Sequence, residues 1–465
     1  MKKKLLVCLF LISGIAKANI TLPAVIGSDM VLQQQSSVKF WGWGNPGEKV
    51  FIIPAWNSHT DSTVVTGDGK WQLYIATPKA GGPFIITIKG NNTITLTNVL
   101  IGEVWICSGQ SNMEYNYNWG LPSLKDELPN LANRNIRFFN IPRTTALHPQ
   151  EDCRARWTVC DSNTVKSFSA VGYYFGKKLN EDLDVPIGLI SASWSGTPAE
   201  PWTPAAIVNG DPALKEAALK QNVSAGWPIN PGYAFNGMIA PLTNYNIAGT
   251  IWYQGESNTK TPGTYEKLFS SMITAWRKKW SKDFPFYFVQ IAPFTYGTKT
   301  EAALLREAQL KTTSLANTGM VVITDLVDDV HDIHPKNKYD VGLRLANLAL
   351  QKNYGKNIYA ESPFYKNIEV LKDKAIVTFN HVDGGLKLKG EKINELFIAG
   401  DDQIFYPAEG KINDGKLIVW SKKVKTPVAV RYAFSNAAIG NLFDNQGLPV
   451  SPFRTDSWNV EMSTE

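Results

Sequence analysis

The spacing of apolar residues divides the chain into three regions of different character. Residues 19–100 contain short runs of β-branched and aromatic residues, separated by turn-forming segments such as Asn-Pro-Gly at 45–47. Several short runs of this kind predict a small antiparallel β-sandwich. The predicted strands cover residues 38–42, 50–53, 71–75, 84–88 and 94–96.

Between residues 101 and 355 the pattern changes to strands that alternate with helices. One helix is predicted by apolar side chains that recur every three or four residues from Tyr265 to Trp276 and form a single stripe. Such alternation predicts an α/β region with a mostly parallel sheet that helices cover on both faces. The predicted strands cover residues 104–107, 187–191, 250–253, 286–291 and 321–324.

After residue 355 short strands return, and a second β domain is expected. Asp-Gly-Gly at 383–385 and Asn-Asp-Gly at 413–415 are typical of hairpin turns. The strands are predicted at residues 375–379, 396–398, 404–406, 417–420 and 428–432. The expected domains are residues 19–100, 101–355 and 356–465.

Residues 1–18 have the pattern of a secretory signal peptide. Lysines at 2–4 precede an apolar run at 5–15, and Ala-Lys-Ala at 16–18 matches a small-x-small cleavage site. The run is too short to span a bilayer comfortably, so a retained anchor is the less favoured alternative. We expect an exported protein, either periplasmic or extracellular.

Charge and composition limit the classes of partner. The net charge is +6, and removal of the four lysines in the first 18 residues leaves +2, which gives no indication of a nucleic-acid or membrane partner. Aromatic residues make up 11% of the chain, which suits β-rich packing and also the stacking of rings on sugars. In an oxidising compartment Cys153 and Cys160 could form a disulfide, whereas Cys107 is expected to be a buried apolar residue.

Polar, glycine-bearing loops follow the predicted strands of the middle region. Because the carboxyl ends of parallel strands open on one edge of a sheet, these loops are expected to converge. Ser111 lies just past the first strand, and a serine hydroxyl becomes an effective nucleophile when a nearby base takes its proton. Taken alone, such a serine is more often a helix cap. The four loops are residues 109–112, 193–197, 254–258 and 328–335.

The histidines narrow the choice of base. Of the five in the chain, only His331 and His334 follow a strand of the predicted sheet. Imidazole, with an ordinary pKa of about 6.5, accepts a proton near neutral pH, and a carboxylate such as Asp332 can fix its tautomer. A metal cluster of these histidines with Asp328, Asp329 and Asp332, or a solvated loop without a role, are the alternatives.

Five segments, in order along the chain, resemble the conserved blocks of the sialate O-acetylesterase family. This family belongs to the SGNH hydrolases, which are serine esterases with a flavodoxin-like sheet. Several ordered motifs are far more specific than one serine, and the resemblance covers most of the chain after residue 18. It implies a flavodoxin-like SGNH core flanked by the two β domains. The segments are 109–113 (GQSNM), 193–202 (SWSGTPAEPW), 253–258 (YQGESN), 332–338 (DIHPKNK) and 447–456 (GLPVSPFRTD).

The resemblance implies Ser111 as nucleophile and His334 as its base. It also implies that the oxyanion of the tetrahedral intermediate is bound by the backbone N–H groups of Ser111 and Gly196 and by a side-chain amide. Donors of this kind typically contribute about 3 kcal/mol each. The chemistry requires no metal or organic cofactor.

The amide donor departs from the family pattern. Many SGNH enzymes have an asparagine two residues after the glycine of the third block, and this chain has Ser257 there. Gln254 is therefore the favoured donor, and Asn258 is the alternative.

The acid departs from the pattern as well, because the position three residues before His334 is His331. Asp332 is the favoured acid, with Asp329 or Glu256 as fallbacks, and a Ser-His dyad is the remaining alternative.

Together these features predict an esterase that removes O-acetyl groups from a sugar, with sialic acid as the favoured substrate. The same chemistry on acetylated xylan or another polysaccharide is one alternative. A non-catalytic carbohydrate-binding protein with a degenerate hydrolase core is another.

Overall fold

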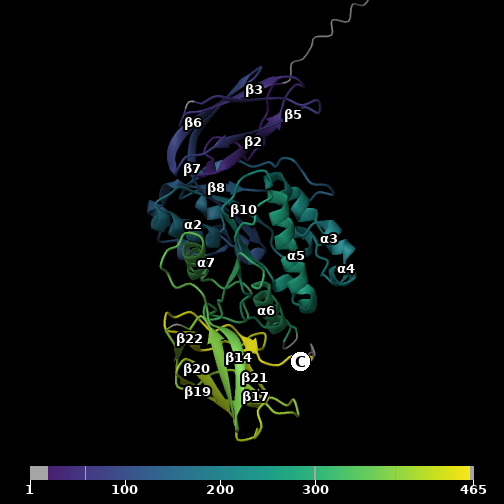
Figure 1. The fold of residues 1–465 in the computed structure, drawn as a ribbon, viewed down its shortest axis with the longest axis vertical. Helices are drawn as coiled ribbons and strands as arrows, with labels where there is room; N and C mark the ends of the chain where they lie inside the picture. Colours follow the sequence, from purple (N-terminus) through teal and green to yellow (C-terminus); the bar gives the residue numbers. More distant parts are fainter. Residues whose placement is uncertain (1–18, 58, 298–299, 383, 461–465) are drawn as a thin grey trace, which may run out of the picture.

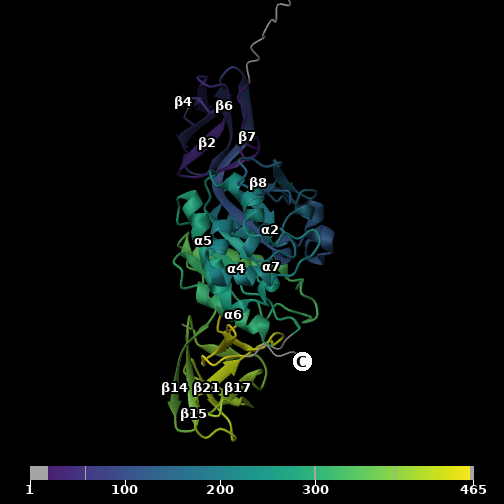
Figure 2. The same ribbon diagram turned by 90° about the vertical axis from the view of Figure 1, so that its right-hand side faces the viewer.

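The computed structural model describes residues 19–460 except for residues 58, 298–299 and 383. The predicted signal peptide, residues 1–18, lies outside the described residues. The chain forms three regions in a row along its long axis: an N-terminal β region, a central α/β region and a C-terminal β region (Figures 1 and 2). Within this described part, no helix is both long enough and apolar enough to cross a membrane.

Among its described residues, the N-terminal region has two sheets around a shared apolar core. Strands β2 and β5 form one antiparallel pair, and β3, β4, β6 and the first half of β7 form the other sheet. Alternate side chains such as Val38, Phe40, Val50 and Ile52 are buried in this core. The strands are β1 (Val31–Gln33), β2 (Ser37–Trp43), β3 (Lys49–Pro54), β4 (Asp61–Val64), β5 (Lys70–Ala76) and β6 (Gly81–Lys89).

Strand β7 (Thr93–Gly109) runs without a break from the N-terminal region into the middle of the central sheet. Its first half pairs antiparallel with β6, and its second half pairs in parallel with β10 and β11. The position between residues 100 and 101, where we predicted a domain boundary, lies inside this strand. The two regions therefore share one strand.

The central sheet has the order β13-β12-β11-β7-β10-β8-β9. Neighbouring strands are parallel, except that β9 runs antiparallel to β8. The strands are β8 (Ala132–Asn140), β9 (Trp157–Asp161), β10 (Ile187–Ser193), β11 (Gly249–Tyr253), β12 (Phe286–Val289) and β13 (Thr318–Val321). The mixed α/β sheet with mainly parallel strands confirms the predicted class, although β8 and β9 were not predicted and β13 begins three residues earlier than expected.

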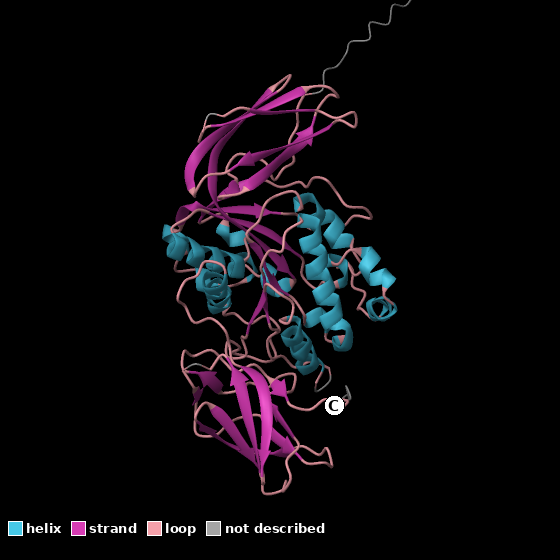
Figure 3. Cartoon of the chain, in the orientation of Figure 1, coloured by secondary structure: helices cyan, strands magenta, loops and turns pink. Residues whose placement is uncertain are grey.

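Helices cover both faces of this sheet (Figure 3). Successive residues of β7 point to opposite faces: Trp105 and Cys107 pack with α2 and α7, whereas Val104 and Ile106 belong to the core that includes α5. A strand buried on both faces reads as a continuous apolar run, which is why it was visible in the sequence. The helices are α1 (Ser111–Glu114), α2 (Ala170–Leu183), α3 (Ala205–Gly210), α4 (Pro212–Leu219), α5 (Pro262–Trp280), α6 (Glu301–Thr312) and α7 (Lys338–Lys352).

In the part that the structure describes, the C-terminal region contains three small antiparallel sheets around its own core. The first has the order β14 (Phe364–Leu371), β15 (Lys374–Asn380), β20 (Lys416–Trp420), β19 (Glu409–Asn413). The second has the order β18 (Tyr406–Pro407), β17 (Leu396–Ala399), β21 (Ala429–Tyr432), β23 (Phe453–Arg454). The third pairs β16 (Leu386–Leu388) with β22 (Leu442–Asp444).

One of the two predicted hairpins forms. Asn413 pairs with Lys416 across a two-residue turn in which Asp414 has φ 49° and Gly415 has φ 69°, the left-handed conformations that a type I′ turn requires. The segment 383–385 does not form the other, because β15 and β16 lie in different sheets. Residue 383 itself lies outside the described residues.

The disulfide that we considered between Cys153 and Cys160 is not formed, and Cys107 is also free. Cys153 packs against the core on the α5 side of the central sheet, whereas Cys160 is buried in the core on the α2 side. Burial raises the pKa of each of the Cys153 and Cys160 thiols to about 12. Their spacing in sequence therefore did not reflect proximity of the sulfur atoms.

Candidate active site

Ser111 begins helix α1 immediately after the carboxyl end of β7. The strand ends at Gly109, which has φ 137°, and a Cβ there would lie 2.2 Å from the backbone oxygen of Tyr253 on β11. Only glycine tolerates both this conformation and this approach of two strands. The turn places Ser111 at the strand tip with 6% of its surface exposed.

A cavity of about 250 Å³ at this edge of the sheet brings together the predicted residues Ser111, Gly196 and His334. They come from three loops that follow β7, β10 and β13. The sequence-based prediction that these loops converge is therefore met. The cavity is lined by Gln110, Ser111, Ser195, Gly196, Pro198, Gln221, Asn222, Trp227, Glu256, Ser257, Ile333 and His334.

The imidazole of His334 lies against Tyr115, with ring centroids 5.5 Å apart and planes inclined by 29°. Its side chain is 31% exposed. Burial lowers the pKa of His334, and the Lys338 and Lys336 cations lower it further, while Asp332 acts in the opposite direction. The neutral ring, which is the form that accepts a proton, is thus favoured. No direct hydrogen bond joins His334 to the Ser111 hydroxyl within the described residues.

Asp332 lies beside His334 but contacts its backbone more closely than its ring. The Oδ1 atom of Asp332 accepts a hydrogen bond from the backbone N–H of His334 at 2.9 Å and lies 4.0 Å from the ring Nδ1. Its Oδ2 atom pairs with Lys336 at 3.0 Å. Among the described residues, neither Asp329 nor Glu256 forms an ion pair with His334, so Asp332 stays the favoured acid.

Two residues that line the cavity have unused backbone donors. Within the described part of the chain, the N–H groups of Ser111 and Gly196 donate to no acceptor. Gly196 has φ 73°, and a Cβ there would lie 2.2 Å from the indole ring of Trp227. Glycine at 196 therefore lets the indole of Trp227, which is 43% exposed, lie directly against the backbone of this residue.

We correct the prediction that Gln254 supplies the third donor. The side chain is fully buried, and its Nε2 atom donates to the Thr197 carbonyl at 3.3 Å and to Asn258 Oδ1 at 2.8 Å. Both amide hydrogens are used, and Gln254 is not among the residues that line the cavity. The alternative, Asn258, donates to Glu200 at 3.0 Å. The amides of both residues hold the third loop against the segment after β10.

Gln110 is a cavity residue whose amide we did not consider from the sequence. The backbone N–H groups of Gly255 and Ser257 both donate to its Oε1 atom at 3.3 Å. Because only the oxygen can accept these hydrogens, the orientation of the amide is fixed and Nε2 faces away from them. Nε2 has no acceptor in the described residues. Gln110 precedes Ser111 directly, so the block 109–113 was the available signal.

A buried polar cluster lies behind the cavity. Lys338 Nζ donates to Asn112 Oδ1 at 2.6 Å, and Asn112 Nδ2 donates to Glu256 Oε1 at 2.6 Å and to the Ile333 carbonyl at 3.0 Å. Burial lowers the pKa of Lys338 to about 7, and burial raises that of Glu256. Both residues lie inside the quoted blocks, yet their burial was not visible in the sequence. No group of three His, Cys, Asp or Glu side chains in the described residues could hold a metal ion.

Comparison with known proteins identifies the class. A family model described as carbohydrate esterase, sialic acid-specific acetylesterase, matches residues 101–351. The chain is 29% identical over 416 residues to the sialate O-acetylesterase of Homo sapiens, covering 81% of this chain and 79% of the human protein. It is 29% identical over 453 residues to that of Pongo abelii, covering 88% and 86%.

A solved structure agrees over nearly the whole molecule. The crystal structure of a carbohydrate acetylesterase from Xanthomonas citri shares 33% identity, with a TM-score of 0.86 and coverage of 95% of this chain and 100% of that chain. The chain therefore belongs to the sialic acid-specific acetylesterase family of carbohydrate esterases. This confirms the resemblance seen in the five motifs.

The charges around His334 predict how its pKa responds to substitution. Asp332→Asn removes the carboxylate that raises the pKa, so the pKa should fall further, whereas Lys336→Gln removes a cation and should raise it. NMR titration of the His334 imidazole measures both changes. Asp328→Asn, in the same loop but without an ion pair to His334, is the control and should leave the titration unchanged. A higher His334 pKa in the Asp332→Asn variant would contradict the assignment of Asp332 as the group that raises it.

Proposed function

We propose that this protein is a serine esterase that hydrolyses O-acetyl groups on a sugar, and that sialic acid is the sugar. The observation that carries the proposal is the shared cavity of Ser111, Gly196 and His334, which combines a nucleophile, unused backbone donors and an imidazole whose pKa is lowered by burial. Family membership supports the esterase class. The choice of sialic acid is supported by the names of the human and orangutan relatives.

In the proposed reaction, the Oγ atom of Ser111 attacks the acetyl carbonyl carbon while His334 accepts the hydroxyl proton. The ester bond to the sugar breaks, and His334 donates that proton to the departing sugar oxygen. Water then attacks the acetyl-enzyme as His334 takes one of its protons. Acetate leaves, and Ser111 regains its proton from His334.

Three donors would bind the oxyanion: the backbone N–H groups of Ser111 and Gly196, and Nε2 of Gln110. None of them has an acceptor within the described residues, so none must break an existing bond as the charge develops. Preorganised donors of this kind stabilise the transition state more than the ground state. Asp332 would stabilise the imidazolium form of His334 by its charge at 4.0 Å.

The volume of the cavity favours a small substrate. Its volume of about 250 Å³ is below the range of about 300–1,000 Å³ that is usual for drug-sized ligands, which suits an acetyl group on a single sugar residue. The exposed indole of Trp227 beside Gly196 provides a flat apolar face for the ring of that sugar. Acetylated xylan is the competing substrate, because the Xanthomonas relative is described only as a carbohydrate acetylesterase.

The signal-peptide pattern of residues 1–18 supports a periplasmic or extracellular location.

Loss of the nucleophile or base should abolish activity. We expect Ser111→Ala and His334→Ala each to lower kcat on p-nitrophenyl acetate by at least about 10³-fold, since the residues act as one unit. Circular dichroism should show that both variants are folded. Activity retained in both folded variants would overturn the mechanism.

The donor role of Gln110 can be separated from its structural role. Gln110→Glu keeps an oxygen for the N–H groups of Gly255 and Ser257 but removes the Nε2 donor, and should lower kcat by about 10²- to 10³-fold. Asn222→Asp introduces a negative charge into the same cavity at an exposed side chain whose Oδ1 atom accepts a hydrogen bond from Lys260. An equal loss in both variants would show that charge alone, and not a lost donor, is responsible.

The substrate is tested by acetate release from mono-O-acetylated sialic acids and from acetylated xylan under matched acetyl concentrations. We expect kcat/KM to be higher for the sialic acids. Faster release from xylan would replace sialic acid as the substrate while leaving the esterase mechanism intact. Glycan binding without acetate release from either substrate would favour the non-catalytic alternative.

A further inference from the structure

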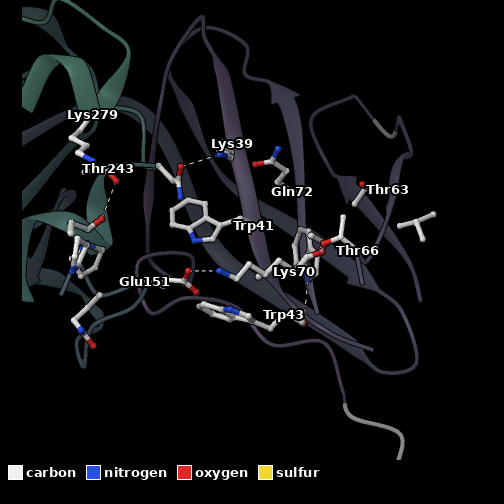
Figure 4. A pocket seen from close by; sticks show the side chains of 18 of the residues that line it. Lys39, Trp41, Trp43, Thr63, Thr66, Lys70, Gln72, Glu151, Thr243 and Lys279 are labelled. Atoms are coloured by element: carbon white, nitrogen blue, oxygen red, sulfur yellow. Dashed lines mark hydrogen bonds and ion pairs between the residues drawn. The ribbon is translucent and has the colours of Figure 1, made fainter. Parts of the chain in front are cut away.

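A second and larger cavity, of about 650 Å³, lies between the N-terminal region and the central region (Figure 4). One wall is formed by strands β2 and β5, and the other by residues 149–151, by segments that precede β11 and by the end of α5. Side-chain contacts join the two walls: Lys39 donates to Asn244 at 2.9 Å, and Lys70 pairs with Glu151. We call this cavity the interdomain cleft.

The strand wall carries tryptophans where polar residues are expected. In the β2–β5 pair, Trp41 lies opposite Gln72 and Trp43 opposite Lys70, on the face that points away from the sandwich core. The outward face of such a sheet is normally polar. Trp41 is 7% exposed and helps to join the two regions, whereas Trp43 is only half-buried and belongs to no core cluster. Neither indole N–H has an acceptor within the described residues.

The cleft also carries positive charge that the protein does not neutralise. Its lining contains three lysines, Lys39, Lys70 and Lys279, and a single carboxylate, Glu151. Glu151 pairs with Lys70. In the described part of the chain, Lys39 and Lys279 have no carboxylate within 4.0 Å. Two cations therefore face the cleft without a counter-charge.

We propose that the interdomain cleft binds a carboxylate-bearing segment of a glycan. Sugar rings stack on the half-exposed face of Trp43, the indole N–H groups and Gln72 offer hydrogen bonds to hydroxyl groups, and Lys39 and Lys279 hold the carboxylate. Flat aromatic faces combined with a few polar groups are what an amphipathic sugar ring requires. Opposite charge selects acidic sugars over neutral ones.

The cleft lies away from the site of ester hydrolysis. It borders the segment that leads into the amino end of β11 and the carboxyl end of α5, whereas Ser111 lies past the carboxyl end of β7. A sugar in the cleft is therefore not the sugar whose acetyl group is removed. The cleft instead anchors another part of the same glycan, which raises the effective concentration of its acetyl groups at Ser111.

The test measures glycan binding by isothermal titration calorimetry in the full-length Ser111→Ala variant, so that it does not depend on turnover. The ligands are oligosialic acid, oligogalacturonic acid and neutral xylohexaose. We expect tighter binding of at least one acidic ligand than of xylohexaose, and the two acidic ligands distinguish a sialic acid from a uronic acid.

Two substitutions in the same background locate the bound glycan. Trp43→Ala should weaken binding of the acidic ligand by about tenfold or more, as expected for loss of a stacking platform. Lys279→Met changes an exposed side chain with no carboxylate partner in the described residues, so it should weaken binding and its salt dependence without affecting the fold. The matched controls are Trp420→Ala, half-buried in the C-terminal region, and Lys278→Met, which does not line the cleft.

Equal affinity of the Trp43→Ala and Lys279→Met variants and their background would overturn the proposal. Equal or weaker binding of the acidic ligands compared with xylohexaose would do so as well. Because binding is measured in an inactive variant, failure of the esterase proposal in the kinetic assays leaves this outcome unaffected.

Discussion

The arrangement of the active site depends on the side chain of Asn112. Its amide contacts two of the other loops at this edge: Glu256 after β11, and both Ile333 and Lys338 from the segment around His334. Asn112 is fully buried, as is Lys338. Unpaired buried polar groups cost about 1–3 kcal/mol each, and more when charged, so these contacts hold the loops in one arrangement. Ser111, adjacent in sequence, takes its position relative to His334 from this anchor.

The charged members of the cluster show how a lysine can be buried here. Lys338 lies 5.3 Å from the centroids of both the Tyr115 and the Tyr253 rings, and its ammonium donates to Asn112. Glu256 supplies the opposing charge, with Asn112 between the two groups. The same lysine also contributes to the neutral state of His334. Structural support and tuning of the base are thus properties of one buried group.

Much of the fold could be predicted because strands buried on both faces give unbroken apolar runs, as in 104–107 and 250–253. The type I′ turn at 413–415 was equally visible, since its two left-handed residues select Asp-Gly. Strand β8 (Ala132–Asn140) was not visible in the sequence, because its first half is polar and largely exposed and only its second half is mostly buried. The 383–385 segment has similar turn chemistry, but β15 and β16 on either side of it pair within different sheets, and partner choice is a tertiary property.

The candidate site, like the fold, could be predicted only in part. The strand pattern was enough to bring the loops to one edge, and the family resemblance was needed to single out Gly196 and His334 in them. The direction of an amide side chain could not be predicted. Gln254 and Gln110 lie in equally plausible motifs, and they differ only in whether neighbouring groups already accept their amide hydrogens.

Strand β7 has a consequence for how this architecture can be rearranged. Its seventeen residues begin at the far side of the N-terminal region and end two positions before Ser111. A cut near residue 100 would therefore divide the central strand of the catalytic sheet and not a linker. Grafting, truncation or recombination of the central region therefore has to keep the N-terminal sheet attached, because both regions are built on the same strand.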